Sequence, residues 1–151
     1  MRVLFLLLII CITATAGLSS WSPTVSVQVT TPQRYSLSIG VSGSNWGSLF
    51  GSDSGILFRV EPGLSGIKLH VGRRGTFNFL MLPMTSVETT AALLHTWNDP
   101  WNGLQADQTY AGLEARYKTL PVVLSVGYYR HIAGSDTEED WITSFGAGVG
   151  F

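Results

Sequence analysis

The sequence predicts an all-β protein, an eight-stranded antiparallel up-and-down transmembrane β-barrel. Beyond the amino-terminal segment, apolar and polar side chains alternate repeatedly from residue 34 to the end, and no helical stripe of apolar residues appears. The carboxy-terminal residues 140–151 alternate most regularly. One face carries aromatic and aliphatic side chains, the other is rich in Ser and Gly, and the chain ends on Phe151. We therefore expect one apolar face towards lipid and one polar face towards a lumen.

The first 16 residues have the pattern of a secretory signal peptide. Arg2 precedes the apolar segment 3–12, and small residues up to Ala16 fit a signal-peptidase site. Ten apolar residues fall short of the roughly 20 that a spanning helix needs, so an uncleaved anchor is the weaker alternative. A lipoprotein signal at Cys11 is a further alternative, although Ile10 stands where a small residue is preferred.

Composition excludes several classes of function. Cys11 is the only cysteine, so the mature chain has no thiol for a disulfide, a nucleophile or a metal site. The 9 Lys and Arg residues nearly balance the 10 Asp and Glu residues, which argues against nucleic acid as a partner. No metal and no cofactor are expected. We expect residues 1–16 to be a signal peptide, 17–33 a periplasmic lead-in and 34–151 a single outer-membrane barrel.

Eight strands are expected within the barrel, separated by residues typical of turns. The long connections 43–54, 98–109 and 133–139 alternate with short ones at 62–65, 83–85 and 119–121, as outside loops and periplasmic turns do. Only a turn at Arg74-Gly75 breaks this alternation. The expected strands are 34–42, 55–61, 66–74, 76–82, 86–97, 110–118, 122–132 and 140–151.

Alternation within residues 17–33 leaves a ninth strand open. Val25, Val27 and Val29 share one face of an extended segment that ends at Thr31-Pro32. A ninth strand would spoil the even count expected of a barrel whose two termini lie in the periplasm. We therefore expect this segment to precede the barrel.

Charged side chains gather on one face of the expected strands. Lys68 and His70, for example, lie opposite Leu69 and Val71. The interior of an eight-stranded barrel is only wide enough to be filled by side chains, and buried charges require partners. We expect an ion-pair and hydrogen-bond network in place of an open pore. Its expected members are Arg59, Glu61, Lys68, His70, Arg74, Glu88, Glu114, Arg116, Lys118 and His131.

A soluble periplasmic carrier of the lipocalin type is the main alternative, because alternation alone does not say which face is inside. Such a carrier would turn its apolar face inward around a ligand. The terminal aromatic residue, the connection lengths and the Gly/Ser face of the last strand favour the membrane. Aromatic residues near the expected outer rim, namely Trp97, Tyr110, Tyr128 and Trp141, fit an interfacial girdle.

With these features, residues 34–151 resemble the small eight-stranded outer-membrane barrels of the OmpA/OmpX type. The resemblance rests on architecture and on the terminal segment 145–151, which ends in Phe151. It implies an outer membrane of the Gram-negative kind, with membrane lipid and lipopolysaccharide as surroundings. It also implies insertion by the barrel-assembly machinery, which in that class recognises the terminal strand ending in Phe151. It implies no substrate.

An enzyme that modifies lipid A is an alternative function within the same architecture. A deacylase of this kind is expected to carry a His-x-Ser pair with an acidic partner, and neither His70, His95 nor His131 has a serine two positions later. The nearest substitute combines His131 with Ser135 and with Glu138 or Glu139. We expect no catalytic residue.

Recognition at the cell surface is the remaining alternative. Exposed loops commonly carry binding residues, and a protein or glycan partner would meet the outside loops first. The residues expected to make such contacts are Trp46, Trp101, Asp136, Glu138 and Glu139.

Overall fold

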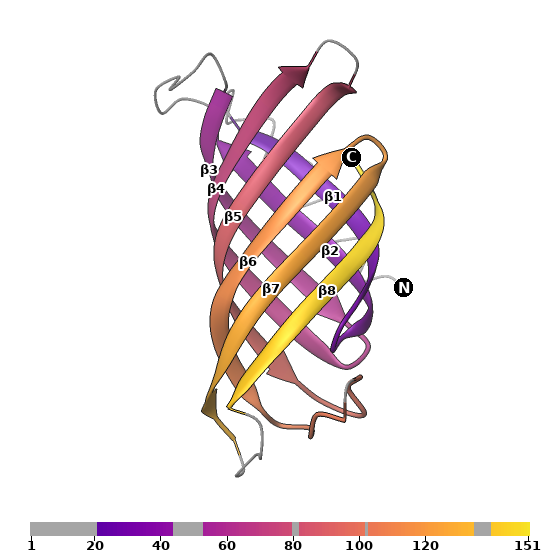
Figure 1. The fold of residues 1–151 in the computed structure, drawn as a ribbon, viewed down its shortest axis with the longest axis vertical. Helices are drawn as coiled ribbons and strands as arrows, with labels where there is room; N and C mark the ends of the chain where they lie inside the picture. Colours follow the sequence, from indigo (N-terminus) through magenta and orange to yellow (C-terminus); the bar gives the residue numbers. More distant parts are fainter. Residues whose placement is uncertain (1–20, 44–52, 80–81, 102, 135–139) are drawn as a thin grey trace, which may run out of the picture.

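The computed structural model describes residues 21–43, 53–79, 82–101, 103–134 and 140–151. Each strand is antiparallel to the next, and the eighth pairs with the first, which closes the barrel (Figure 1). No helix in the described ranges has the length and apolar character needed to cross a membrane. The strands are β1 Trp21–Thr30, β2 Arg34–Gly43, β3 Asp53–Gly63, β4 Gly66–Phe79, β5 Leu82–Thr96, β6 Thr109–Thr119, β7 Val122–Ala133 and β8 Trp141–Gly150.

The amino-terminal boundary expected for the barrel is wrong. Residues 21–30, expected to be part of a lead-in, form β1 and pair with β2 along their whole length. They also close the barrel against β8, where Val27 lies opposite Val149. The alternating valines of this segment thus belong to a barrel strand, and Pro32 lies in the turn that follows it.

The expected turn at Arg74-Gly75 is also wrong, because both residues lie within β4. Gly75 has a ladder partner on either side, Ser54 on β3 and Val87 on β5. A residue paired on both sides continues a strand, so the expected strand 66–74 and residues 76–79 of the next expected strand form one long element, whereas Leu82 already belongs to β5. The missed β1 and the split β4 compensate each other, which is why the expected number of strands is correct.

These two errors reverse the direction expected for the first three strands. The terminal end of the barrel holds the start of β1 and the end of β8, together with the β2–β3, β4–β5 and β6–β7 connections (Figure 1). The opposite, distal end holds the other four connections. The long connection after β2 therefore lies at the terminal end, whereas those after β5 and β7 lie at the distal end. The alternation expected from connection lengths holds only in the second half of the chain.

The inner and outer faces of the strands agree with the expected alternation. Val27 is 54% exposed, whereas the neighbouring Gln28 is 1% exposed. The same contrast recurs in β3, where Phe58 and Val60 are exposed and Arg59 and Glu61 are buried. The barrel therefore has an apolar outside and a polar, charged inside.

One part of the lumen is apolar, towards the distal end. Leu104, from the β5–β6 connection, packs there with side chains from the ends of four strands. Tyr110, expected at the outer rim, is fully buried in this group because it has the same strand parity as Glu114. We call this group the distal cluster; its members are Ala92, Leu94, Leu104, Tyr110, Tyr129 and Ile142.

The β5–β6 connection is held against the two short distal turns. The backbone amide of Trp97 donates to the carbonyl of Ser65 at 3.1 Å, and that of Trp101 donates to the carbonyl of Pro32 at 2.9 Å. Arg34 forms an ion pair with Asp99 beside them. These contacts fix the loop that supplies Leu104 to the lumen.

Candidate functional site: the charged lumen

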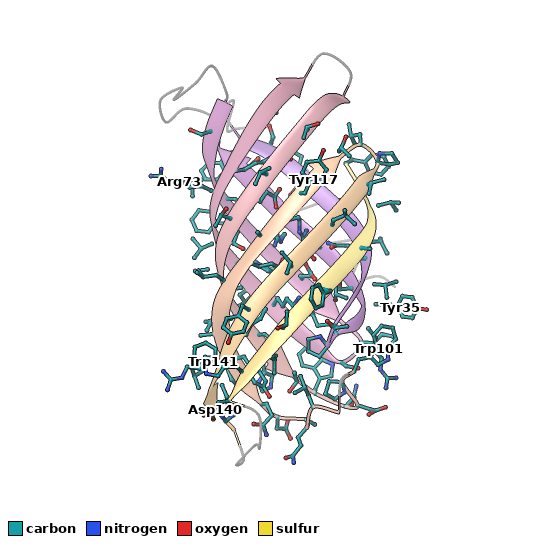
Figure 2. All side chains as sticks on the ribbon, viewed as in Figure 1. Tyr35, Arg73, Trp101, Tyr117, Asp140 and Trp141 are labelled. Atoms are coloured by element: carbon teal, nitrogen blue, oxygen red, sulfur yellow. The ribbon has the colours of Figure 1, made fainter. Side chains whose placement is uncertain are left out.

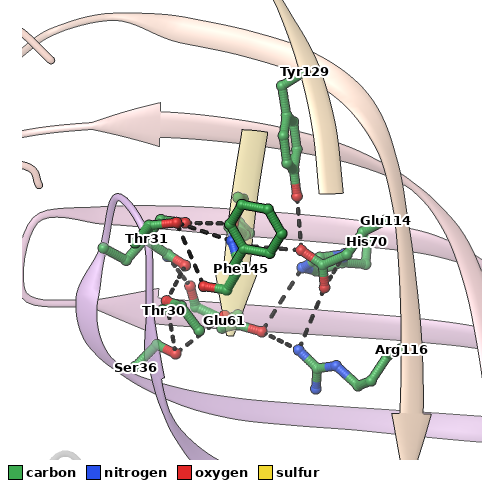
Figure 3. Close-up of polar contacts among 12 residues, drawn as sticks. Thr30, Thr31, Ser36, Glu61, His70, Glu114, Arg116, Tyr129 and Phe145 are labelled. Atoms are coloured by element: carbon green, nitrogen blue, oxygen red, sulfur yellow. Dashed lines mark hydrogen bonds and ion pairs between the residues drawn. The ribbon is translucent and has the colours of Figure 1, made fainter. Parts of the chain in front are cut away.

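Seven charged or titratable side chains meet in the middle of the lumen. Figure 3 labels four of them, namely Glu61, His70, Glu114 and Arg116. They come from alternate positions of the neighbouring strands β3, β4, β5 and β6, and none is more than 4% exposed. Three are cations and three are carboxylates, so their charges balance when the histidine is neutral. We call this group the central cluster; its members are Arg59, Glu61, Lys68, His70, Glu88, Glu114 and Arg116.

Arg59 joins carboxylates from different strands. Its Nη1 lies 2.5 Å from Glu88 Oε2 on β5, and its Nη2 lies 2.9 Å from Glu114 Oε1 on β6. Glu61, on its own strand, lies 3.9 Å from its Nε. The planar guanidinium can donate in several directions at once, so Arg59 links strands that are not neighbours in the sheet.

Glu61 and Arg116 form a second ion pair, between β3 and β6. Ser36 Oγ donates to Glu61 Oε1 at 3.1 Å, and Arg116 Nη1 donates to Ser38 Oγ at 3.1 Å. Both hydroxyls come from β2. The pair is therefore attached to the part of the barrel wall that carries no charged group of the central cluster.

Glu114 accepts hydrogen bonds from opposite sides of the lumen. Tyr129 Oη on β7 donates to its Oε2 at 2.8 Å, and Lys68 Nζ on β4 lies 3.2 Å from the same oxygen. Lys68 also donates to Ser144 Oγ on β8 at 2.9 Å. A buried carboxylate is stable only when its oxygens are paired in this way.

Two glycines make room for the ring of Tyr129. A Cβ built at Gly127 would lie 2.5 Å from Tyr129 Cε2, and one at Gly112 would lie 2.8 Å from Tyr129 Cδ1. Gly112 is the ladder partner of Tyr129, and Gly127 precedes it by two residues on β7. The ring thus lies flat against the wall, which allows its hydroxyl to reach Glu114.

His70 lies among the charges with hydrogen-bond partners at only one of its two ring nitrogens. Its Nδ1 is 3.2 Å from Thr90 Oγ1 and 3.1 Å from Arg59 Nη2. Because the guanidinium can only donate, Nδ1 is the acceptor. Its Nε2 has no hydrogen-bond partner among the described residues and lies 3.9 Å from Glu61 Oε2.

Glu61, His70 and Glu114 offer ligand atoms that all lie within 4.8 Å of one another, a spacing that a metal ion could use. The same carboxylate oxygens, however, are held by protein cations. Arg116 pairs with Glu61, while Arg59 and Lys68 pair with Glu114. A divalent ion would have to displace these pairs and would add charge to a balanced group, so the donor set favours ion pairing over metal binding.

The structure places three other expected network residues away from the central cluster. Arg74 is half-buried nearer the terminal end, where its Nη1 donates to Ser42 Oγ at 3.3 Å. Lys118 lies near the end of β6, and neither residue forms an ion pair with a described carboxylate. His131 lies towards the distal end, with its ring edge-on to Tyr110 at 5.3 Å.

The expected surface and assembly residues are only partly described. Trp101 lies at the distal end and is 38% exposed (Figure 2). Phe151 is 80% exposed, and its backbone amide donates to the carbonyl of Val25 on β1 at 2.9 Å. The remaining expected positions lie outside the described residues: the signal peptide 1–16, Trp46, Ser135, Asp136, Glu138 and Glu139.

Sequence reasoning left the neutral polar partners out of the network, among them Ser36, Ser38, Thr90, Tyr129 and Ser144. These five residues occupy inward positions of their strands, so alternation alone could have included them. Ionic side chains on an inward face are recognisable in a sequence because burying a charge requires a partner. The neutral hydroxyls that complete their hydrogen bonds carry no such signal.

The arrangement is suited to holding charges in place more than to reacting with a substrate. Ser144 and Lys68 are in contact, but Lys68 is paired with Glu114 and Ser144 donates to the carbonyl of Thr31. Both side chains are thus engaged in structural contacts, whereas a serine nucleophile requires a free base beside it. Comparisons with protein-family models, curated proteins and solved structures find no match to this chain.

Proposed function

We propose that the chain is an integral outer-membrane β-barrel with a structural or surface-interaction role, and that the central cluster closes its lumen. The observation that carries this proposal is the polarity of the barrel wall. Charged side chains of the central cluster are buried, whereas Leu113 is 65% exposed and Phe145 is 59% exposed. In water so many exposed apolar side chains would be costly, and soluble proteins rarely expose large continuous apolar patches.

Aromatic residues at the two ends of the wall support the same proposal. Tyr128 stacks on Trp141 with ring centroids 5.0 Å apart, and the guanidinium of Arg130 lies 5.5 Å from the Trp141 ring. Figure 2 shows Trp141 and Tyr35 towards the distal end and Tyr117 towards the terminal end. Amphipathic aromatic side chains favour the two membrane–water interfaces.

The interior of the barrel does not match a soluble lipocalin-like carrier, the main alternative. A lipocalin-like carrier needs an apolar cavity inside the barrel, whereas the middle of this lumen is filled by paired charges and its apolar part is packed by Leu104 and Tyr110. Insertion by the barrel-assembly machinery and an environment of lipopolysaccharide remain part of the proposal. Phe151, an exposed aromatic residue that follows the strand closing the barrel, supports the former.

We further propose that the distal end faces outward. The start of β1 and the end of β8 would then lie on the periplasmic side, as in other even-stranded barrels. The long β5–β6 connection with Trp101 would lie at the cell surface, where it could meet a protein or glycan partner.

Gel mobility of outer-membrane fractions tests the proposal. Unboiled protein should migrate faster than boiled protein, because a closed barrel in detergent stays compact until it is heated. Recovery in the soluble periplasm without a heat-dependent shift would contradict a membrane barrel. A variant lacking residues 21–30 serves as a control, since without β1 the barrel loses both ladders that close it.

A further inference from the structure

The outer wall of the barrel carries a groove across β3, β4, β5 and β6, with a volume of about 420 Å³. The outward side chains that line it are all apolar, and they come from the middle of β3 and from the distal halves of β4, β5 and β6. They are Phe58, Val60, Leu69, Val71, Ala91, Leu93 and Ala111.

Two alanines form the depression. Ala91 lies in the ladder between Val71 on β4 and Leu113 on β6. Ala111 lies opposite Leu93, one row further towards the distal end. A methyl group projects much less from the wall than the branched side chains beside it, so the two short residues leave an elongated apolar hollow.

Arg73 lies at the end of this groove. It follows Val71 by two residues on the same face of β4, which places it roughly 7 Å further towards the terminal end at the usual rise of a strand. It is exposed, and Figure 2 shows it projecting from the wall near the level of Tyr117. The arginine therefore stands near the terminal rim of the apolar wall.

Within the described part of the chain, Arg73 forms no ion pair with a carboxylate and does not lie over an aromatic ring. Two other arginines that are at least partly exposed differ, because Arg34 pairs with Asp99 and Arg130 lies over Trp141. An exposed guanidinium next to an apolar groove matches a ligand that has an anion at the polar end of an apolar chain.

We propose that this site binds a phospholipid, with its phosphate on Arg73 and one acyl chain in the groove. The inference rests on the proposed membrane location. A guanidinium binds phosphate through paired, charge-assisted hydrogen bonds, and an apolar hollow within the hydrocarbon layer matches an acyl chain. Arg73 lies near the terminal rim, so the lipid belongs to the leaflet at the terminal end.

A second copy of the chain is the competing occupant. Its apolar wall would fill the groove but would place Arg73 against apolar side chains without a counter-charge. Burying an unpaired charge is costly, so the combination of groove and arginine favours a lipid.

Native mass spectrometry of the full chain purified from membranes tests the site, with dioleoylphosphatidylglycerol as the probe. Arg73→Gln removes the phosphate partner, and Ala91→Phe fills the groove. Each should reduce retention of the lipid about tenfold, because the first variant loses a hydrogen bond to a charged group and the second loses the space for the acyl chain. Dioleoylglycerol, which lacks the phosphate, should be retained as weakly by the wild type as the phospholipid is by Arg73→Gln.

Matched controls make the same chemical changes elsewhere on the wall. Arg130→Gln alters an arginine at the other rim, and Ala147→Phe enlarges an exposed alanine on β8. Both should retain the lipid like the wild type. Ala111→Leu replaces Ala91→Phe if the latter does not fold.

Equal retention of the phospholipid by the wild type, Arg73→Gln and Ala91→Phe would overturn the site. A dimer that Ala91→Phe abolishes would assign the groove to a second copy instead. Heat-dependent gel mobility, measured on the same samples, separates the two proposals: a folded membrane barrel without lipid retention contradicts only the lipid site.

Discussion

Tyr129 donates its phenolic hydrogen to Glu114 across a distance of 2.8 Å, and both residues are almost fully buried in the lumen. This contact joins β7 to β6 within the lumen, in addition to the backbone ladder between them. Through Glu114 it extends to Lys68 on β4 and to Arg59 on β3. One neutral hydroxyl thus supports a buried carboxylate that also pairs with two cations.

Replacing Tyr129 by Phe should destabilise the barrel by about 1.5–3 kcal/mol, the usual contribution of a hydrogen bond to a charged group. The variant keeps the ring but leaves one interaction of a buried carboxylate unmade. Urea unfolding in lipid vesicles, followed by tryptophan fluorescence, measures the change. Tyr128→Phe is the matched control, because Tyr128 lies on the outer wall, and it should unfold like the wild type. Equal stability of both variants would contradict the contribution assigned to the Tyr129 hydroxyl.

Gly127→Val should displace the Tyr129 ring. Even a Cβ at this position would lie 2.5 Å from that ring, and overpacking of this kind typically costs about 1–3 kcal/mol. Gly43→Ala is the control, since a Cβ there meets its nearest atom at 3.5 Å, an ordinary contact. The same unfolding assay compares the two variants. If Gly127→Val costs as much in a Tyr129→Ala background, which lacks the ring, as it does in the wild type, the predicted clash with the Tyr129 ring is refuted.

Glu61 and Arg116 should behave as one unit. Glu61→Leu alone leaves a buried guanidinium without its closest carboxylate, an arrangement that typically costs about 3–5 kcal/mol. Removing both charges with Glu61→Leu and Arg116→Leu should cost less than the sum of the two single changes, and a double-mutant cycle measures the difference. Additive losses would show that the pair is not coupled. Arg74→Leu offers a comparison, because Arg74 forms no ion pair with the described residues.

Alternation in the sequence predicted which side chains face inward, because the two faces of a strand differ strictly by parity. The predicted strand boundaries were wrong where a proline or glycine could belong either to a turn or to a strand. Thr31-Pro32 was expected to end a lead-in but lies in the turn after a barrel strand, and Gly75 was expected to turn but is paired on both sides. Deleting residues 21–30 should therefore abolish the heat-modifiable gel band, whereas a dispensable lead-in predicts that the band persists.

The partners within the lumen lay beyond sequence reasoning for a different reason. Arg59 and Glu114 are on strands three apart, and Lys68 reaches Ser144 on β8. Such contacts depend on the tilt and stagger with which the sheet closes. Parity predicts that a charge points inward, but it does not say which inward charge it will meet.

The central cluster should also block ion flow. Its side chains are buried and paired, so the wild-type barrel in a planar lipid bilayer is expected to show no sustained conductance. Arg59→Ala removes the cation that joins Glu88 to Glu114 and leaves space beside two carboxylates. We expect this variant to show brief cation-selective openings, at least several times more frequent than in the wild type. Arg73→Ala removes an arginine from the outer wall and should stay as silent as the wild type. Sustained conductance of the wild type, or equal conductance of the two variants, would contradict closure of the lumen by this cluster.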